Sequence, residues 1–480
     1  MDTLNQSAKS KVSNISRRSF ISGAVASTAV FTVVPGHVLA GRRHVPPSEK
    51  VNTAVIGTGG QGIQNMKTLL GHADVQVTAV CDVTEEADYS RFYYGGTGGR
   101  KPALELVQKH YSNQKATGHY KGCGCYIDFR KMFDKERNID AVLVATPDHI
   151  HAVATMAAIQ RAKHVYCEKP LTHSIWEARK ITEAARKAKV ATQMGNQGHS
   201  GEGIRLTCEW IWDGAIGPVR EVHAWSNTGV DWASYRVTMP KEKPPVPAGL
   251  DWKLWIGPTP HRPYHPAYTP YNWRGWWDFG TGAIGDMACH NMDPAFWALK
   301  LGHPVSVEAC ATNINPETTP FGSIVYYEFP AREEMPPVRV TWYSGGLMPP
   351  GPEELEPGRE LTGGGNGILF IGDKGKIMCP GWGGNPRIIP EAKMKEYKLP
   401  PKTIPRSKGH HRDWIDACKG GKSASSDFDY AGPMTEVVLL GNVALRTGEK
   451  LSWDGKNLKA ANCLEADVYI RPEYHNGWSL

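Results

Sequence analysis

Residues 57–62 read GTGGQG and stand directly between an apolar strand-like run and a helix-like stretch. In that setting Gly57 permits a tight turn, Gly59 lets the backbone approach a pyrophosphate, and Gly62 allows close packing of the helix. The pattern alone is weak, and a plain glycine-rich turn is the alternative. Its position after a strand and before a helix predicts a loop that holds a dinucleotide at the helix N-terminus.

The same turn opens an alternation of short β-branched runs and helix-like stretches, which predicts a parallel sheet with crossover helices. The strand-like runs are residues 51–57, 75–83, 141–147, 164–170 and 190–196, and the helix-like stretches are residues 61–70, 149–162 and 175–189. Each run ends in polar or special residues, and ligands of such sheets bind at those carboxyl ends. We therefore expect a doubly wound α/β domain over residues 51–196.

Asp82 closes the second run, where its carboxylate can accept both ribose hydroxyls of an adenosine. It would repel a 2′-phosphate, and residues 83–86 hold no arginine to bind one, so NAD is favoured over NADP. The residues expected to bind the cofactor are Gly57, Thr58, Gly59, Gly60, Gln61, Gly62, Asp82, Thr146, Pro147, His149, His151, Glu168 and Lys169. Residues 84–120 depart from the repeat, and we interpret them as a surface insertion without a chemical role.

Lys169 stands in a Glu-Lys-Pro sequence at the end of the 164–170 run. Its side chain is therefore expected to emerge where a nicotinamide ring would lie. An ammonium group there can polarise a substrate oxygen as it becomes a carbonyl. The alternative is a surface lysine that merely follows a strand.

Residues 280–293, GTGAIGDMACHNMD, place Asp286 and His290 four residues apart. On a helix the two side chains share one face, so that the carboxylate can orient or charge-stabilise the imidazole, a candidate base for a hydroxyl proton. A structural pair and a metal site are the alternatives. No third ligand follows at a recognisable spacing, which disfavours a metal, although His149 and His151 keep that alternative open.

Tryptophan is unevenly distributed, since all 16 tryptophans lie at or after Trp176 and several crowd residues 225–277. Flat aromatic faces suit the C–H faces of a pyranose, but an irregular loop held by its own aromatic packing is an equal alternative. Polar clusters near residues 196–199 and 410–412 would suit sugar hydroxyls or loop capping. The candidate substrate residues are Asn196, Gln197, His199, Trp276 and His411.

The N-terminus carries Arg17 and Arg18, then an apolar stretch over residues 20–34 that is too short for a stable span, then VLA at residues 38–40. We interpret residues 1–40 as a twin-arginine signal and residues 41–50 as a linker, which predicts a periplasmic protein exported after folding. An ordinary secretory signal or an uncleaved anchor is the alternative. No membrane partner is expected beyond the export machinery.

Composition limits the class of protein. A chain of 480 residues is long enough for two or three domains, and a net charge of +7, partly within the signal, gives no reason to expect nucleic acid. Cys81, Cys167 and Cys208 lie in apolar or helical runs, and Cys123-Gly124-Cys125 lacks a redox or zinc spacing. Mostly buried free thiols are expected, with a disulfide through Cys123 or Cys125 left open.

Three motifs together resemble the glucose-fructose oxidoreductase, inositol dehydrogenase and rhizopine-catabolism (Gfo/Idh/MocA) family: GTGGQG, the Glu-Lys-Pro sequence, and GTGAIGDMACH. The resemblance extends from residue 51 to the C-terminus, where residues 367–379, 410–422 and 430–451 look like a longer bacterial subgroup. It implies that Lys169, Asp286 and His290 are catalytic, and that residues 197–480 form an α+β substrate domain with a largely antiparallel open sheet. It also implies a homo-oligomer.

The resemblance implies an NAD-dependent oxidoreductase that acts on a hydroxyl of a sugar, glycoside or polyol. Some family members are glycosidases that oxidise a sugar transiently, and the branch known for this carries a Thr-His-Gly run in place of the Asp and His signature found here. Glycoside hydrolysis is therefore one alternative, and a non-catalytic NAD-binding protein is another. Export of a folded protein also implies tightly bound NAD that is regenerated in place.

Overall fold

The structure, a computed structural model, describes residues 49–116, 120–228, 238–362 and 365–480. The predicted signal, most of the predicted linker and Trp232 of the aromatic stretch lie outside the described residues. A single compact unit runs from Lys50 to Leu480. Among the described residues, no helix is both long enough and apolar enough to cross a membrane.

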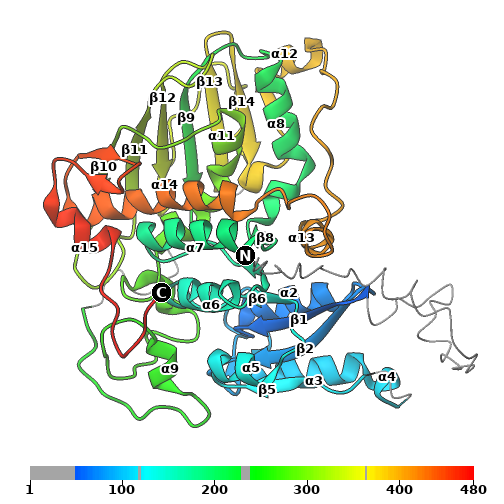
Figure 1. The fold of residues 1–480 in the computed structure, drawn as a ribbon. Coiled ribbons are helices and arrows are strands. Elements are labelled where there is room, and N and C mark those ends of the chain that lie inside the picture. The colour runs from blue at the N-terminus through cyan, green and yellow to red at the C-terminus, as the bar shows by residue number, and fades with distance from the viewer. Residues whose placement is uncertain (1–48, 117–119, 229–237, 363–364) are drawn as a thin grey trace, which may run out of the picture. The chain divides into compact units, whose positions relative to one another are not determined.

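Six strands in the described part of the chain form a parallel sheet (Figure 1). They are β1 (Val51–Ile56), β2 (Val75–Cys81), β5 (Gly124–Tyr126), β6 (Ala141–Val144), β7 (His164–Cys167) and β8 (Thr192–Met194). Their order, β5-β2-β1-β6-β7-β8, changes direction at β1, which opens a crevice between the loops after β1 and β6. The predicted doubly wound domain is confirmed, with β5 as a short strand that its sequence, GCY, does not reveal.

Helices cover both faces of this sheet. They are α2 (Gly60–Leu70), α3 (Arg100–His110), α5 (Phe129–Lys135), α6 (Asp148–Ile159) and α7 (Ile175–Ala188). Because successive strand residues point to opposite faces, Val55 of β1 packs in a core with α2 and α3, whereas Ile56 packs in a core with α5 and α6. A helix from far along the chain, α13 (His410–Cys418), adds Trp414 to the first of these cores.

A second sheet of nine strands is present within the described ranges, in the order β15-β14-β13-β9-β12-β11-β10-β16-β17. It is antiparallel except between β9 and β12, which are parallel, as expected for the second domain. The strands are β9 (Val219–Ser226), β10 (Ser306–Ala311), β11 (Ser323–Phe329), β12 (Val338–Tyr343), β13 (Asn366–Gly372), β14 (Gly375–Pro380), β15 (Arg387–Ile389), β16 (Leu451–Asp454) and β17 (Lys459–Ala460).

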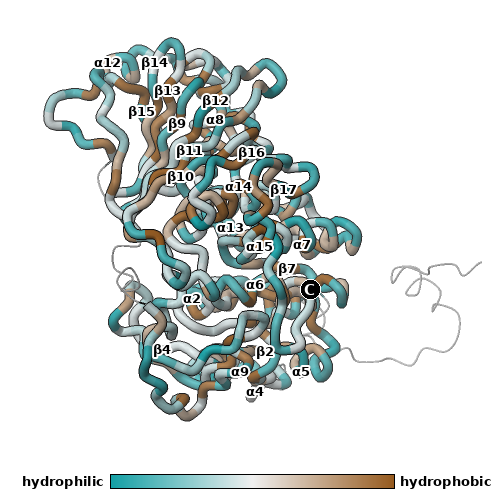
Figure 2. Tube along the Cα trace, turned by 90° about the vertical axis from the view of Figure 1, so that its left-hand side faces the viewer, coloured by the Kyte–Doolittle hydropathy of each residue, from teal (hydrophilic) through white to brown (hydrophobic). Residues whose placement is uncertain are grey.

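Helices back one face of the large sheet, where hydrophobic residues concentrate around α14 (Figure 2). Ile368 and Phe370 of β13 pack into this core, while Leu369 between them packs into a smaller cluster on the other face. The backing helices include α8 (Glu202–Trp212), α11 (Asp293–Ala298) and the long α14 (Phe428–Thr447). In Figure 1, α14 lies alongside α7, so the two halves share a continuous core.

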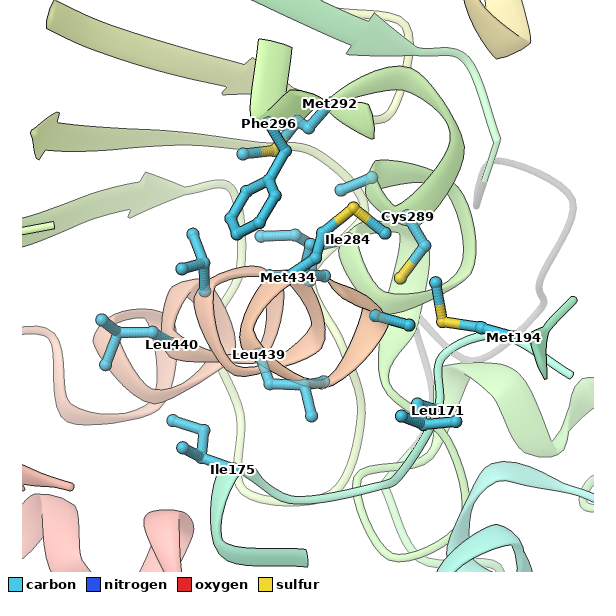
Figure 3. Close-up of a cluster of buried hydrophobic side chains, with 14 of the residues drawn as sticks. Leu171, Ile175, Met194, Ile284, Cys289, Met292, Phe296, Met434, Leu439 and Leu440 are labelled. Carbon is cyan, nitrogen blue, oxygen red and sulfur yellow. The ribbon is translucent and has the colours of Figure 1, made fainter. Parts of the chain in front are cut away.

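A hydrophobic cluster around α14 holds the segment after β7 against residues 280–293 (Figure 3). Leu171, which directly follows the Glu-Lys-Pro sequence, is fully buried there, and Ile284 and Cys289 join it from the 280–293 segment. Gly441 lets α14 approach closely, because a Cβ there would lie 2.4 Å from Ile284 Cδ1. Each fully buried leucine of this kind stabilises the fold by about 1.5–3 kcal/mol. The packing therefore fixes two sequence-distant loops against each other.

Candidate active site

A cavity of about 670 Å³ lies at the carboxyl ends of β1, β2, β6 and β7. Its lining extends from the glycine turn to residues of the second half of the chain. The polar and charged side chains around it include Gln61, Asp82, Asp148, His151, Glu168, Lys169, Gln197, Asn227, Arg274, Asp286, His290 and Asn366. This is the position at which doubly wound domains bind ligands.

The glycine turn has the geometry that its sequence predicts. Gly57 has φ +83, and a Cβ there would lie 2.5 Å from the carbonyl oxygen of Ala145. A Cβ at Gly62 would lie 1.9 Å from the carbonyl oxygen of Gly57, so only glycine allows α2 to start this close to the strand. Gly57, Gly59 and Gly60 line the cavity at the start of α2, where N–H groups can receive a phosphate. The residues present therefore fit a dinucleotide.

Asp82 lines the same cavity at the end of β2. Its carboxylate accepts hydrogen bonds from the backbone N–H groups of Thr58, at 2.7 Å, and Thr84, at 2.8 Å. Arg100, which the sequence places far from the strand end, returns beside it, but its guanidinium donates to the carbonyl oxygens of Val83 and Gly249 and to Glu85. This arginine is therefore occupied by partners within the protein.

The insertion at residues 84–120 is not merely a surface feature, contrary to its sequence interpretation. It forms the two short strands β3 (Ala87–Asp88) and β4 (Thr97–Gly98), and its Tyr89 and Tyr94 line the cavity. A Cβ at Gly60 would lie 2.2 Å from the Tyr94 ring, so this ring packs directly against the glycine turn. Phe92 stacks on Tyr271 of the second half, with ring centroids 4.3 Å apart. These aromatic contacts hold the insertion against the cavity.

Lys169 and Asp286 form an ion pair inside the cavity. The ammonium Nζ of Lys169 donates to Asp286 Oδ1 at 2.7 Å and to the Asp286 carbonyl oxygen at 2.8 Å. Burial alone would lower the pKa of Lys169, but the charge and hydrogen bond of Asp286 outweigh it and raise this pKa above its ordinary value. Lys169 is therefore a stable cation that can donate to a substrate oxygen.

The carboxylate of Asp286 is thus directed to Lys169 rather than to the imidazole of His290. The reason is local: residues Ile284–Ala288 form one turn of π-helix, and α10 (Cys289–Asn291) follows it. A π-turn changes the angular offset between residues four apart, so the i, i+4 argument from an α-helix fails here. The expected orienting role of Asp286 is corrected accordingly, but both residues line the cavity, and the negative charge of Asp286 still acts to raise the pKa of His290.

His290 is buried, and its Nδ1 has no hydrogen-bond partner among the described residues. Burial, and then the positive charge of Lys169, lower the pKa of His290 well below its ordinary value. The ring is therefore neutral at physiological pH, and a neutral imidazole can accept a proton. The same cavity therefore contains a fixed cation, Lys169, and a neutral base, His290.

Two charged residues that the sequence reasoning missed also line this end of the cavity. Asp148 accepts hydrogen bonds from the Thr281 hydroxyl, at 2.6 Å, and from its backbone N–H, and burial raises the pKa of Asp148 to about 7. Arg274 lies 3.6 Å from Asp286 and donates to the hydroxyl of Tyr94. Asp148 directly follows Thr146 and Pro147, two of the expected cofactor residues, so its position after a strand is the sequence feature that indicates a place in the site.

The loop after β6 contributes Thr146, Pro147 and His151 to the cavity, as expected of cofactor residues. His151 is fixed, with its ring nitrogens 2.7 Å from the Pro170 carbonyl oxygen and 2.8 Å from that of Thr146. His149 does not line the cavity, because its ring is buried between the carbonyl oxygens of Phe279 and Trp255. Two other expected cofactor residues, Thr58 and Gly62, also lie outside the lining. The Thr58 backbone N–H donates to Asp82, and Gly62 leaves room for the Gly57 carbonyl oxygen.

Of the candidate substrate residues, Gln197 lines the cavity, where it donates to Glu168. The other four do not line it, because their side chains form hydrogen bonds or pack elsewhere in the fold. Asn196 and His199 bind the buried carboxylate of Asp293, His411 stacks on Tyr166, and Trp276 packs in a cluster with Trp252, Trp255, Tyr268 and Phe279. Most of the aromatic stretch is therefore an irregular loop held by its own aromatic packing and not a sugar-binding surface.

The ten cysteines all lie within the described residues and are free thiols. Cys123 and Cys125 are among them, so neither forms a disulfide. No group of three or more possible metal ligands occurs in the part of the chain that the structure describes.

Comparison with known proteins agrees with this geometry. Residues 51–196 match the NAD-binding Rossmann domain of the Gfo/Idh/MocA oxidoreductase family, and residues 205–329 match the C-terminal α/β domain of that family. The WlbA dehydrogenase of Bordetella pertussis, solved with NADH and UDP-GlcNAcA, has a similar fold, with a TM-score of 0.53, 16% identity and coverage of 84% of this chain and 99% of that one.

Curated relatives match shorter segments. The levoglucosan dehydrogenase of Pseudarthrobacter phenanthrenivorans is 27% identical over 169 residues, which cover 35% of this chain and 35% of that protein. A glycosyl hydrolase family 109 protein of Stenotrophomonas maltophilia is 32% identical over 154 residues, covering 32% of this chain and 29% of that protein. The two family matches together cover more than half of the chain, which therefore belongs to the Gfo/Idh/MocA oxidoreductase family and contains its NAD-binding Rossmann domain.

Proposed function

We propose that this protein is an NAD-dependent oxidoreductase that acts on a hydroxyl of a sugar, glycoside or polyol. One observation carries the proposal: a cationic Lys169 and a neutral His290 line the same cavity as the glycine turn. Relatives named levoglucosan dehydrogenase and 1,5-anhydro-D-fructose reductase support the substrate class. A protein that only binds NAD has no use for this pair of groups.

Each residue has a defined task in this reaction. Lys169 donates a hydrogen bond to the substrate oxygen and stabilises negative charge as that oxygen becomes a carbonyl, while Asp286 keeps the ammonium in place. His290 takes the hydroxyl proton. Bound NAD would supply the acceptor for the hydride. Acid–base help of this kind accelerates a reaction by about a hundred-fold to ten-thousand-fold.

We further infer that the cofactor is NAD rather than NADP and that it is held tightly. Asp82 would repel a 2′-phosphate, and Arg100 is engaged with carbonyl oxygens and Glu85. The packing of Tyr94 on the glycine turn and the stacking of Phe92 on Tyr271 support slow release, because these contacts hold the insertion against the start of α2.

Tight retention agrees with the proposed export. A protein carried folded through the twin-arginine pathway, as Arg17 and Arg18 suggest, can take its cofactor to the periplasm. The cofactor must then be regenerated in place, either by a second sugar or within a redox-neutral sequence of oxidation, elimination and re-reduction. We expect the exported protein to be a homo-oligomer.

Glycoside cleavage by transient oxidation is the second candidate. Similarity to a glycosyl hydrolase family 109 protein supports it, and so does Asp148, a carboxyl group with a pKa raised by burial to about 7 that simple oxidation does not require. A group that exchanges protons near neutral pH suits an elimination step. Product analysis separates the two candidates, because only cleavage releases an aglycone.

The test begins with the purified full-length protein. Heat-released nucleotide is identified by chromatography, and a panel of free sugars, polyols and glycosides is then screened for nicotinamide reduction and for products. Lys169→Met and His290→Ala are expected to slow hydride transfer by about a hundred-fold to ten-thousand-fold while NAD affinity stays nearly unchanged. Lys180→Met, an exposed position on α7, is the matched control. Near wild-type hydride transfer in either site variant would exclude that residue from the mechanism.

A further inference from the structure

Trp382 is the most exposed of the tryptophans that line the cavity. It is 49% exposed, whereas Trp255 and Trp273, which line the same cavity, are 4% and 8% exposed. A large indole that remains half exposed beside a site offers apolar area that the folded chain itself does not use. It stands in the sequence Pro-Gly-Trp-Gly-Gly, which begins at the last residue of β14 and lies outside the aromatic stretch of residues 225–277.

The backbone holds Trp382 in an unfavourable conformation. It has φ +59 and ψ +20 within the short turn η6 (Gly381–Gly383), the left-handed region that bulky side chains rarely adopt. The Asn291 side-chain oxygen accepts its backbone N–H at 3.1 Å. Gly198 leaves room for the turn, because a Cβ there would lie 2.6 Å from the Trp382 carbonyl oxygen. Strain of this kind persists where the surroundings impose it, and it is concentrated at functional sites.

The indole lies next to the candidate base. The ring centroids of Trp382 and His290 are 5.8 Å apart, with the planes inclined by 68°. Asn291, which holds the turn, directly follows His290 in the chain, so the base and the indole are positioned by neighbouring residues. A ligand in contact with the indole face would therefore lie within reach of the imidazole.

Amide groups surround the same end of the cavity. Asn366 and Asn227 both line it, and the Asn366 amide donates to the Asn227 side-chain oxygen at 3.3 Å. Asn291 in turn donates to the Asn366 side-chain oxygen at 3.3 Å. Amides both donate and accept, so this chain of side chains can match the mixed donor and acceptor character of sugar hydroxyls.

We propose that Trp382 is the stacking surface for a pyranose ring, with Asn227 and Asn366 as partners for its hydroxyls. The proposal rests on the proposed sugar oxidoreductase function and narrows its substrate class to ring-form sugars and glycosides. A pyranose presents a rigid face of C–H groups to the electron-rich indole face. An open-chain polyol has no such rigid face, so it gains less from the indole and loses more freedom on binding.

The test measures binding directly, by calorimetry, in the full-length protein saturated with NAD. The probes are the methyl pyranosides of glucose, galactose, mannose and xylose, together with the corresponding open-chain alditols. Trp382→Ala is expected to weaken pyranoside binding by about 10- to 100-fold, and Trp382→Phe by less, while alditol and NAD binding stay unchanged. Trp212→Ala is the matched control, because Trp212 is 42% exposed and does not line the cavity.

Trp382→Gly separates a binding role from a structural one. Glycine accepts a positive φ without strain, so this variant is expected to unfold no earlier than the wild type while pyranoside binding is lost. Pyranoside affinity that is unchanged in Trp382→Ala would overturn the proposal. So would a wild type that binds NAD and an alditol but no methyl pyranoside, a result that leaves the proposed oxidoreductase function intact. Failure to bind NAD at all would instead refute that function.

Discussion

Replacing Asp286 by asparagine tests the ion pair on which the candidate site depends. Lys169 Nζ lies 2.7 Å from Asp286 Oδ1, a separation that corresponds to an attraction of about 6 kcal/mol at an effective dielectric constant of about 20. The side chains are 16% and 18% exposed, and removing both charges from water offsets much of this attraction. The expected loss of unfolding free energy in Asp286→Asn is therefore about 3–5 kcal/mol, as for other broken buried pairs.

The same change should alter the titration of Lys169. In the wild type the pKa of Lys169 is raised, so the contribution of the pair to stability is complete below the ordinary lysine pKa and is lost as the pH rises through the higher, folded value. Without the carboxylate, burial remains the largest influence and lowers the pKa of Lys169, as does the charge of Arg274, whereas Tyr94 acts to raise it. The ammonium group should therefore lose its proton at a lower pH in the variant.

Competitive acylation with acetic anhydride measures this shift without any substrate. Only the neutral amine reacts, so mass spectrometry of the peptide that contains Lys169, over a range from about pH 6 to about pH 11, reports its protonation. Glu436→Gln is the control, because Glu436 forms a pair of 2.8 Å hydrogen bonds with Arg179 and does not line the cavity. It should destabilise the fold without moving the labelling curve. Identical curves for the wild type and Asp286→Asn would refute the reasoning.

Three further predictions concern the fold that carries the site. Gly62→Ala should abolish NAD binding and lower the melting temperature, because a Cβ would lie 1.9 Å from the Gly57 carbonyl oxygen, whereas Gly302→Ala, with open space around it, should do neither. Trp414→Ala should cost about 3–5 kcal/mol in urea unfolding, since this fully buried indole from α13 fills the core beneath the parallel sheet; a loss below about 1 kcal/mol would contradict that packing. Burial alone would raise the pKa of Asp74, but its hydrogen bonds and ion pairs with two cationic partners hold this pKa well below its ordinary value. Its stabilisation is therefore present above about pH 4 and is lost as the pH falls, so acid unfolding of Asp74→Asn should show a weaker pH dependence than that of the wild type.

Local sequence patterns predict the structure correctly where a residue's role follows from its neighbours in the chain. The need for glycine at positions 57 and 62 is set by the turn between a strand and a helix, and the structure shows the close contacts that this turn requires. The place of Lys169 follows from the end of β7 in the same way. Both arguments use only the order of strand, turn and helix, which the sequence records directly.

Spacing failed where one turn of helix departed from regular geometry. The four-residue interval between Asp286 and His290 predicted a pair on one helix face, but the π-turn over Ile284–Ala288 and the nearby ammonium of Lys169 direct the carboxylate elsewhere. Similarly, tryptophan density in residues 225–277 left a sugar surface and a self-packed loop equally open, and Trp252, Trp255 and Trp276 pack on one another. Composition cannot separate an aromatic side chain that fills a core from one that faces a cavity.

The sequence by itself determined the doubly wound domain, the cofactor turn and the identity of a lysine and a histidine with the right chemistry, because each depends on short-range order along the chain. Tertiary structure decided which groups meet. The ion pair joins residues 117 positions apart, the insertion at residues 84–120 reaches the cavity through contacts with Tyr271, and α13 returns to complete the first core. These contacts arise from the burial of apolar surface across the whole chain, a global condition that no local pattern encodes.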